Sequence, residues 1–201
     1  MAHVSGVVLA GGQSRRMGGS PKALLPFGDR PLIQHIVERV AGVLPDCLLV
    51  TNSPEAYAFL ARPMVADVFA DGGSLGGIYS GLAAATGEAA LCVACDMPFL
   101  APGLLAYLAG RAAEADVVIP EAAGELQTLH AVYGKACLPA MERRLRAGQL
   151  KVTGFFGDVR VLRIGEAEIA RVADPAVAFM NLNTPDDLAR ARELWDRPPD
   201  G

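Results

Sequence analysis

The sequence V-S-G-V-V-L-A-G-G-Q-S-R-R-M-G-G-S-P-K-A-L, residues 4–24, passes abruptly from an apolar run into glycine and positive charge. The continuous apolar character of residues 4–10 is typical of a strand that is buried on both faces of a sheet. Gly11 and Gly12 carry no Cβ, so the chain can turn tightly there and a ligand can approach the backbone. The stretch therefore predicts a buried first strand that ends at a ligand-binding turn.

The charges that follow the two glycines indicate the kind of ligand. Exposed N–H groups in such a turn form a nest for an anion, and Arg15, Arg16 and Lys22 add full positive charges to it. Arginine offers a fork that matches a phosphate group, whereas lysine acts as a mobile point charge. The loop has neither the Gly-Lys pair of a P-loop nor the G-x-G-x-x-G of a dinucleotide-binding turn. We therefore predict a triphosphate cradle of another kind.

The rest of the chain alternates short apolar runs with helical patterns. The apolar runs predict further strands at residues 47–51, 63–68, 89–95, 116–120, 127–133 and 160–164. The helical patterns cover residues 31–43, 54–61, 75–86, 102–115, 135–146 and 185–195. This alternation predicts an α/β protein with a three-layer, doubly wound, mostly parallel, Rossmann-like sheet. Ligands in such sheets bind at the carboxyl ends of the strands, where Gly11 and Asp96 both fall.

Composition excludes several classes of protein. A chain of 201 residues with 52% hydrophobic and 20% charged residues predicts one folded domain rather than a disordered chain. The net charge of −4 disfavours nucleic acid as a partner, because proteins that bind it usually carry a basic surplus. No apolar run approaches the roughly 18 residues that span a bilayer, and the first residues lack a basic leader. We therefore expect no membrane association and a cytoplasmic location.

The four cysteines favour a structural role. Cys92 and Cys95 form C-V-A-C within a predicted strand, where residues three apart point to opposite faces and cannot chelate one ion together. No second C-x-x-C and no cluster of histidines completes a zinc site. These residues, with Cys47 and Cys137, are interpreted as small core side chains.

Four segments carry a resemblance to a known family. L-A-G-G-Q-S-R-R-M-G-G-S-P-K-A-L (residues 9–24) resembles the signature of the molybdenum cofactor guanylyltransferases, within the wider nucleotidyltransferase superfamily. G-S-L-G-G-I-Y-S-G-L (residues 73–82) is similar to that family's G-P-L-x-G-I element, with Ser74 in place of the usual proline. C-D-M-P-F-L (residues 95–100) and N-L-N-T-P-D-D-L (residues 181–188) resemble its metal-binding and C-terminal elements. The resemblance implies a nucleotidyltransferase fold spanning almost the whole chain.

The implied reaction transfers GMP from GTP to the terminal phosphate of molybdopterin or the molybdenum cofactor and releases pyrophosphate. Such transfers depend on positioning and charge neutralisation. The resemblance implies Lys22, Arg16 and Asp96 as catalytic residues, with Asp96 also holding Mg²⁺. From position alone, Asp96 is equally well read as a strand-ending residue that caps the next turn. Magnesium suits the first reading, because it commonly takes one or two carboxylates and substrate phosphates.

The same resemblance implies a set of nucleotide-binding residues. They are Leu9, Ala10, Gly11, Gly12, Lys22, Asn52, Asp67 and Asp96. The backbone of the first three is expected to recognise the base, and Asn52 and Asp67 follow the second and third predicted strands. Asp71 is a rival to Asp67, because the loop length before Gly73 blurs the register. Asn52, in T-N-S-P, is also a residue that commonly starts a turn.

The acceptor side is predicted less directly. Asn181 and Asn183 are two apart and face the same way if extended, so their amides are candidates for binding the acceptor. Asn183 also competes as a helix N-cap, a role that Thr184 fills equally well. His130 lies in a strand pattern and is read as structural. Lys151 falls where relatives often carry arginine near the acceptor, a departure that leaves its role open.

We expect a single nucleotidyltransferase domain, with a nucleotide-binding half of about residues 1–120 and an acceptor-binding half of about residues 121–201. Molybdoenzymes or their chaperones are further partners that the resemblance implies. A related nucleotidyltransferase that uses CTP or a sugar-phosphate acceptor is the alternative, and relatives of those kinds typically carry L-A-A-G where this chain has L-A-G-G. A non-catalytic nucleotide-binding module is a third reading, disfavoured because Lys22, Asp96 and Asn183 occur together.

Overall fold

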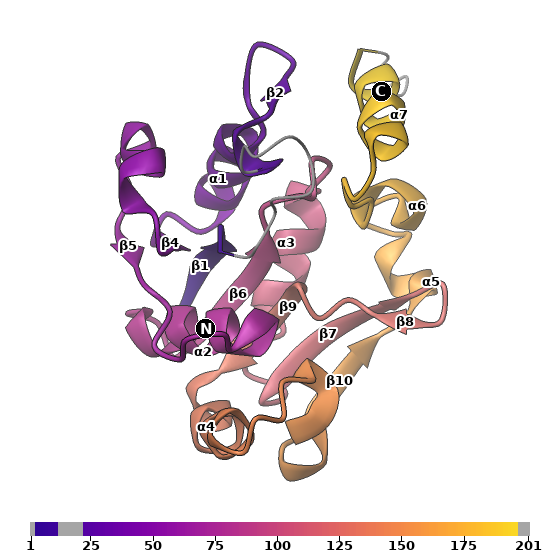
Figure 1. Ribbon diagram of the computed structural model, residues 1–201. Coiled ribbons are helices and arrows are strands. Elements are labelled where there is room, and N and C mark those ends of the chain that lie inside the picture. The colour runs from indigo at the N-terminus through magenta and orange to yellow at the C-terminus, as the bar shows by residue number, and fades with distance from the viewer. Residues whose placement is uncertain (1–2, 12–21, 197–201) are drawn as a thin grey trace.

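One mixed sheet organises the chain, which the computed structural model describes over residues 3–11 and 22–196 (Figure 1). Its strands are β1 (Val4–Leu9), β4 (Cys47–Val50), β5 (Met64–Val65), β6 (Ala89–Ala94), β7 (Val117–Ala122), β8 (Glu125–Leu126), β9 (His130–Gly134) and β10 (Val161–Ile164). They are ordered β10-β7-β9-β6-β1-β4-β5, with β8 paired to β7. Strands from both halves of the sequence therefore belong to one sheet.

The sheet is mostly parallel, as the sequence predicts. β1 pairs in parallel with β4 on one side and β6 on the other, β4 with β5, and β7 with β10. β9 is the strand that runs against its neighbours, antiparallel to both β6 and β7. The parallel strands β1, β4 and β6 therefore present their carboxyl ends at one edge.

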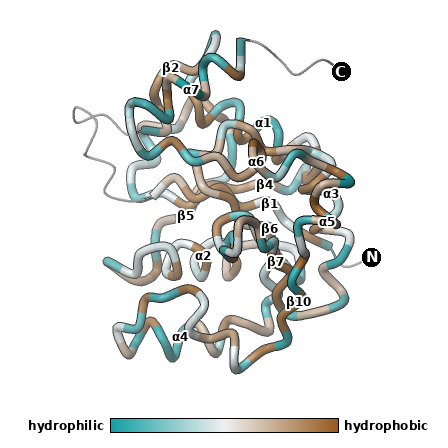
Figure 2. The backbone as a smooth tube through the Cα atoms, turned by 90° about the vertical axis from the view of Figure 1, so that its right-hand side faces the viewer, coloured by the Kyte–Doolittle hydropathy of each residue, from teal (hydrophilic) through white to brown (hydrophobic). Residues whose placement is uncertain are grey.

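Helices cover both faces of the sheet, which confirms the three-layer prediction. On one face, α1 (Leu32–Val43), α3 (Pro102–Gly110) and α7 (Pro185–Asp196) pack in one hydrophobic cluster. On the other face, α2 (Gly73–Ala84) and α4 (Leu138–Arg146) pack in a second cluster. Figure 2 shows α1 on one side of β1, β4 and β6, and α2 and α4 on the other.

The first strand is buried on both faces because its side chains alternate between the two clusters. Val4 and Val8 belong to the α1 cluster, whereas Val7 and Leu9 belong to the α2 cluster. Helix α2 approaches β1 closely at Gly81, where a Cβ would lie 2.4 Å from Val7 Cγ1. The glycine-rich sequence of α2 therefore permits a tight helix–sheet contact on this face.

Several local predictions were wrong. Residues 54–61, predicted as a helix, form the 3₁₀-helix η2 (Pro54–Leu60), and α4 begins only after the short 3₁₀-helix η3 (Lys135–Cys137). The predicted helix 102–115 ends at Gly110, because the chain continues in i→i+3 turns such as Glu114 N to Arg111 O. Sequence patterns also did not predict several short elements: β8, the hairpin strands β2 (Pro26–Phe27) and β3 (Arg30–Pro31), η4 (Val152–Asp158), α5 (Glu166–Ile169) and α6 (Pro175–Ala178).

The β2–β3 hairpin packs against the C-terminal helix at the end of the molecule where the label C stands in Figure 1. Phe27 and Trp195 meet edge to face with ring centroids 4.9 Å apart, and Arg192 donates a hydrogen bond to the Pro26 carbonyl. Among the described helices, none has both the length and the apolar character that crossing a membrane requires.

Candidate nucleotide site at the carboxyl edge of the sheet

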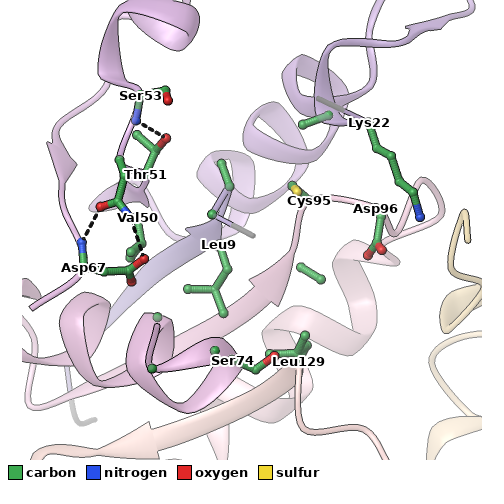
Figure 3. A pocket seen from close by; sticks show the side chains of 18 of the residues that line it. Leu9, Lys22, Val50, Thr51, Ser53, Asp67, Ser74, Cys95, Asp96 and Leu129 are labelled. Carbon is green, nitrogen blue, oxygen red and sulfur yellow. Dashed lines mark hydrogen bonds between the residues drawn. The ribbon is translucent and has the colours of Figure 1, made fainter. Parts of the chain in front are cut away.

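A pocket of about 760 Å³ opens where β1, β4 and β6 end (Figure 3). It is lined by Leu9, Ala10, Gly11, Lys22, Ala23, Val50, Thr51, Asn52, Ser53, Tyr57, Asp67, Asp71, Gly72, Gly73, Ser74, Gly77, Ala94, Cys95, Asp96 and Leu129. Backbone hydrogen bonds join the three strand ends, since Ala10 N donates to Val50 O and Cys95 N donates to Leu9 O. Chain segments far apart in the sequence thus form one rigid rim.

Lys22 and Asp96 lie in this same pocket. Lys22 begins the short 3₁₀-helix η1 (Lys22–Leu24), and Figure 3 shows its side chain reaching toward the Asp96 carboxylate at the end of β6. Burial raises the pKa of Asp96 above its usual value, and the charge of Lys22 opposes that shift. The partly buried carboxylate is therefore stabilised by positive charge, from the lysine and from any cation that binds beside it.

Asn52 and Asp67 form a two-way hydrogen-bonded pair on the opposite wall. Asn52 Nδ2 donates to Asp67 Oδ2 at 2.9 Å, and Asp67 N donates to Asn52 Oδ1 at 2.9 Å. The second carboxylate oxygen, Asp67 Oδ1, is buried without a partner among the described residues. Gly11 and Gly77 lie beside this carboxylate, because a Cβ on either would come within 4 Å of an Asp67 oxygen. This carboxylate therefore keeps hydrogen-bonding capacity that no described residue uses.

Asp71, the rival to Asp67, lines the pocket too. Its backbone lies in the left-handed region, with φ of +57°, and its side chain is exposed. It makes no side-chain hydrogen bond with any residue that the structure describes, in contrast to the paired Asp67.

The predicted acceptor residues lie beside the pocket rather than in its wall. Leu182 N donates to the backbone carbonyl of Asp96 at 2.9 Å, and Lys22 Nζ donates to the backbone carbonyl of Asn183 at 3.3 Å. Asn181 contributes a weak hydrogen bond from Nδ2 to the Phe179 carbonyl at 3.4 Å. The segment that contains both asparagines is therefore fixed to the two charged residues through its backbone.

The helix cap after this segment is resolved in favour of Thr184. Thr184 Oγ1 accepts a hydrogen bond from Asp187 N, while Asp187 Oδ2 accepts from the backbone N–H groups of Thr184 and Asn183. This reciprocal pair is a capping box for α7. The Asn183 amide is consequently not used as the cap.

Other predicted residues have varied outcomes. Gly12, Arg15 and Arg16 lie outside the described residues. His130 is completely buried, with a pKa lowered to about 4 by burial and its ring edge to face with Phe179, 5.1 Å between centroids. Lys151 is exposed and does not line the pocket.

The cysteines are free, and burial raises their thiol pKa values. Among the described residues, no three His, Cys, Asp or Glu side chains gather as a metal site. Cys95 differs from the other cysteines because it lines the pocket next to Asp96. Sequence patterns did not single out Cys95, Tyr57 or Leu129 as pocket residues, since all three read as apolar positions of strands and helices.

One carboxylate fits a magnesium site only of the kind in which substrate phosphates supply further ligands. Asp96 meets that requirement, because its partly buried carboxylate lines a pocket that holds a lysine and is large enough for a nucleotide.

A doubly wound sheet with a lysine and a carboxylate at its carboxyl edge defines the class of an α/β nucleotidyltransferase. Residues 6–158 match the MobA-like NTP transferase domain. The chain belongs to this family, whose enzymes generally depend on a divalent metal ion.

Two curated relatives and one solved structure resemble the chain over nearly its full length. A probable molybdenum cofactor guanylyltransferase of Pelotomaculum thermopropionicum is 41% identical over 201 residues, 100% of this chain and 98% of the relative. The molybdenum cofactor guanylyltransferase of Desulfosudis oleivorans is 36% identical, over 95% of each chain. The crystal structure of molybdopterin-guanine dinucleotide biosynthesis protein A from Archaeoglobus fulgidus has a TM-score of 0.83 at 25% identity, covering 96% of this chain and 99% of that one.

Proposed function

We propose that this nucleotidyltransferase transfers GMP from GTP to the terminal phosphate of molybdopterin or the molybdenum cofactor and releases pyrophosphate. Its relatives carry the corresponding name at 32–41% identity over nearly the whole chain. The single observation that carries the proposal is that Lys22 and Asp96 line one pocket at the carboxyl edge of the sheet.

Guanine is recognised by the wall opposite Lys22. Guanine presents two adjacent donors, N1–H and the exocyclic amine, and the Asp67 carboxylate lines the pocket with hydrogen-bonding capacity that no described residue uses. Asn52 orients this carboxylate through two hydrogen bonds: its Nδ2 donates to Asp67 Oδ2, and its Oδ1 accepts from Asp67 N. The backbone of Leu9, Ala10 and Gly11 contacts the base from the end of β1. We assign the base contact to Asp67 rather than Asp71, because Asp67 is the one oriented by a partner.

The phosphates lie toward Lys22. In the reaction, an oxygen of the acceptor's phosphate attacks the α-phosphorus of GTP, and the bond between that phosphorus and the oxygen bridging to the β-phosphate breaks. Lys22 neutralises charge that develops on the departing pyrophosphate. Arg16 and the Gly11–Gly12 turn contribute to the same cradle in the proposal, Arg16 as a catalytic residue. No side-chain nucleophile is required for this transfer.

Asp96 would hold Mg²⁺, which would supply charge neutralisation to the substrate phosphates when bound. Burial raises the pKa of Asp96, and the charge of Lys22 opposes that shift and so favours the ionised carboxylate. The lysine thus serves two roles, stabilising the Asp96 carboxylate and contacting the triphosphate.

The acceptor binds next to the C-terminal segment. Asn181 and Asn183 offer amides to the pterin or its phosphate, and the backbone of this segment is tied to Asp96 and Lys22. The nucleotide-binding half thus corresponds to about residues 1–120 and the acceptor-binding half to about residues 121–201. Molybdoenzymes or their chaperones receive the product in the cytoplasm.

The test measures product formation from purified protein, Mg²⁺ and molybdopterin with each of GTP, CTP, ATP and UTP. Pyrophosphate release and a guanine dinucleotide that form with GTP alone are expected. Turnover with CTP, or with sugar 1-phosphates in place of molybdopterin, would assign the chain to a different nucleotidyltransferase. GTP binding without pyrophosphate release under any of these conditions would overturn catalysis in favour of a binding module.

A further inference from the structure

Tyr57 is a pocket residue to which the reaction above assigns no part. It lies on η2, directly after the strand that ends near Asn52, and only 3% of its surface is exposed. Its ring packs in the α1 cluster, together with Ala23 and Phe27. Tyr57 nevertheless lines the nucleotide pocket, so the exposed remainder of the residue faces the ligand.

The hydroxyl of Tyr57 has no partner among the described residues. Buried tyrosine hydroxyls normally find one, because an unpaired polar group in a core is costly. Among the described residues, the polar side-chain atoms that are both sealed from solvent and unpaired are Asp67 Oδ1 and the two ring nitrogens of His130. Tyr57 Oη is not one of them, so this unpaired hydroxyl keeps some exposure to solvent. Tyr57 Oη is therefore a donor that a ligand in the pocket can satisfy.

The surroundings indicate which part of the ligand it meets. Asp67 lies beside Gly77 of α2, on the face of the sheet where the base is placed. Tyr57 belongs instead to the cluster on the α1 face, together with Ala23 and the partly buried Cys95, which also line the pocket. Ala23 directly follows Lys22 in η1. Burial raises the pKa of Tyr57 to about 12, so the hydroxyl stays protonated at neutral pH and can donate to an anion.

We propose that Tyr57 Oη donates a hydrogen bond to a phosphate oxygen of the bound nucleoside triphosphate, as a positioning residue opposite the base-binding wall. The proposal rests on the proposed function only in taking a nucleotide as the ligand. A neutral donor of this kind holds the phosphate chain without adding charge, which leaves charge neutralisation to Lys22 and the metal.

The experiment compares the binding of GTP, GDP, GMP and guanosine to the wild-type protein and to Tyr57→Phe by titration calorimetry with Mg²⁺ present. Hydrogen bonds to charged groups predict about a tenfold or greater loss of GTP affinity in Tyr57→Phe. The affinity for guanosine should be unchanged. In ³¹P NMR spectra, at least one resonance of bound GTP should shift between the two proteins.

Tyr79→Phe is the matched control, because Tyr79 is also partly buried, packs on Phe69 and does not line the pocket. It should bind every ligand as the wild type does. Equal loss for guanosine and GTP would move Tyr57 to the nucleoside and overturn the proposal. The proposal would also be overturned if Tyr57→Phe kept its GTP affinity and its ³¹P shifts while its melting temperature changed. Tyr57 would then contribute only to core packing. Failure of the wild-type protein to bind GTP would instead count against the proposed function itself.

Discussion

The two sides of the pocket are built differently. On the side that we propose binds the nucleotide (the nucleotide side), the ends of β1, β4 and β6 are joined by backbone hydrogen bonds, and the Asn52–Asp67 pair is bonded in both directions. On the side that we propose binds the acceptor (the acceptor side), residues 179–184 form neither a helix nor a strand. A few backbone hydrogen bonds hold that segment, among them the bond from Leu182 N to Asp96 O. The nucleotide side is therefore preorganised by the sheet, whereas the acceptor side depends on individual contacts.

Lys22 belongs to both sides, so its removal is the strongest test of the comparison. Lys22→Ala removes the positive charge beside Asp96 and the hydrogen bond to the Asn183 carbonyl. We expect kcat to fall by about 10²–10³-fold, the usual cost of removing one group that stabilises developing charge. Steady-state pyrophosphate release measures it.

The control for this substitution is Lys135→Ala, because Lys135 donates to the Ala85 carbonyl away from the pocket. That variant should keep its kcat. If Lys22→Ala turned over as fast as the wild type, Lys22 would have no part in catalysis. It would then not connect the two sides of the pocket functionally.

Asp96→Asn should affect turnover and stability in opposite directions, lowering the first and raising the second. Metal-supported turnover should fall by at least about 10²-fold, since the amide cannot replace a carboxylate on Mg²⁺. Because burial raises the pKa of Asp96 in the folded state, folding favours the protonated carboxyl group. This contribution to stability is fully present below the unfolded pKa and is lost as pH rises through the folded value. At neutral pH its charge therefore costs stability, and Asp96→Asn should melt at a higher temperature than the metal-free wild type.

Calorimetric melts from pH 4 to 8 measure this effect, and the gap between the two proteins should narrow toward low pH. A variant that melts lower than the wild type at pH 7 would mean that the carboxylate is a structural cap, the reading that position in the sequence alone left open.

The packing beneath the nucleotide side makes a smaller, purely structural prediction. A Cβ at Gly81 would lie 2.4 Å from Val7 Cγ1 and 3.0 Å from Val50 Cγ2. Gly81→Ala should therefore lower the free energy of unfolding by about 1–3 kcal/mol, the usual cost of overpacking a core. Gly42→Ala in α1, where a Cβ meets nothing within 4 Å, should raise it by up to about 1 kcal/mol.

Urea denaturation of the two variants gives both numbers. If Gly81→Ala were as stable as Gly42→Ala, α2 would not be held rigidly against β1, and the preorganisation assigned to the nucleotide side would lose its physical basis.

The same contrast explains what the sequence could predict. The strands of the nucleotide side are predicted by continuous apolar runs in the sequence, and Lys22 and Asp96 follow two of these runs. The three layers and the mostly parallel sheet follow from the alternation of strands and helices, whereas the strand order and the antiparallel β9 do not. Elements of two to seven residues, such as the β2–β3 hairpin and η4, have no such rhythm, and tertiary contacts decide them.

The site was predictable only as far as side-chain type allows. Our proposal of Asp67 over Asp71 depends on its hydrogen bonds to Asn52, 15 residues away, which no local pattern encodes. The helix predicted over residues 54–61 assigned no role to Tyr57. Its packing in the α1 cluster and its position at the pocket depend on residues far away in the sequence, which no local pattern reveals. The link from Lys22 to the Asn183 carbonyl, 161 residues apart, was likewise invisible in the sequence.

The smallest expected effect concerns the acceptor side. Thr184→Ala removes the hydroxyl that accepts from Asp187 N and should cost about 1 kcal/mol of stability, the usual value for an N-cap. Because the capped helix anchors residues 181–183, the KM for molybdopterin should rise several-fold while GTP affinity stays constant. Thr153→Ala, in η4 outside the pocket, is the matched control and should change neither.

The pH dependence of this anchor provides a second measure. The hydrogen bond from Thr184 lowers the pKa of Asp187, so the contribution of the capping box is fully present above the unfolded pKa and is lost as pH falls through the lowered value. The difference in stability between the wild type and Thr184→Ala should thus be constant near neutral pH and shrink only in acid. An equal rise of KM for GTP and for molybdopterin in Thr184→Ala would mean that the two sides of the pocket are coupled, because loosening one would then disturb the other.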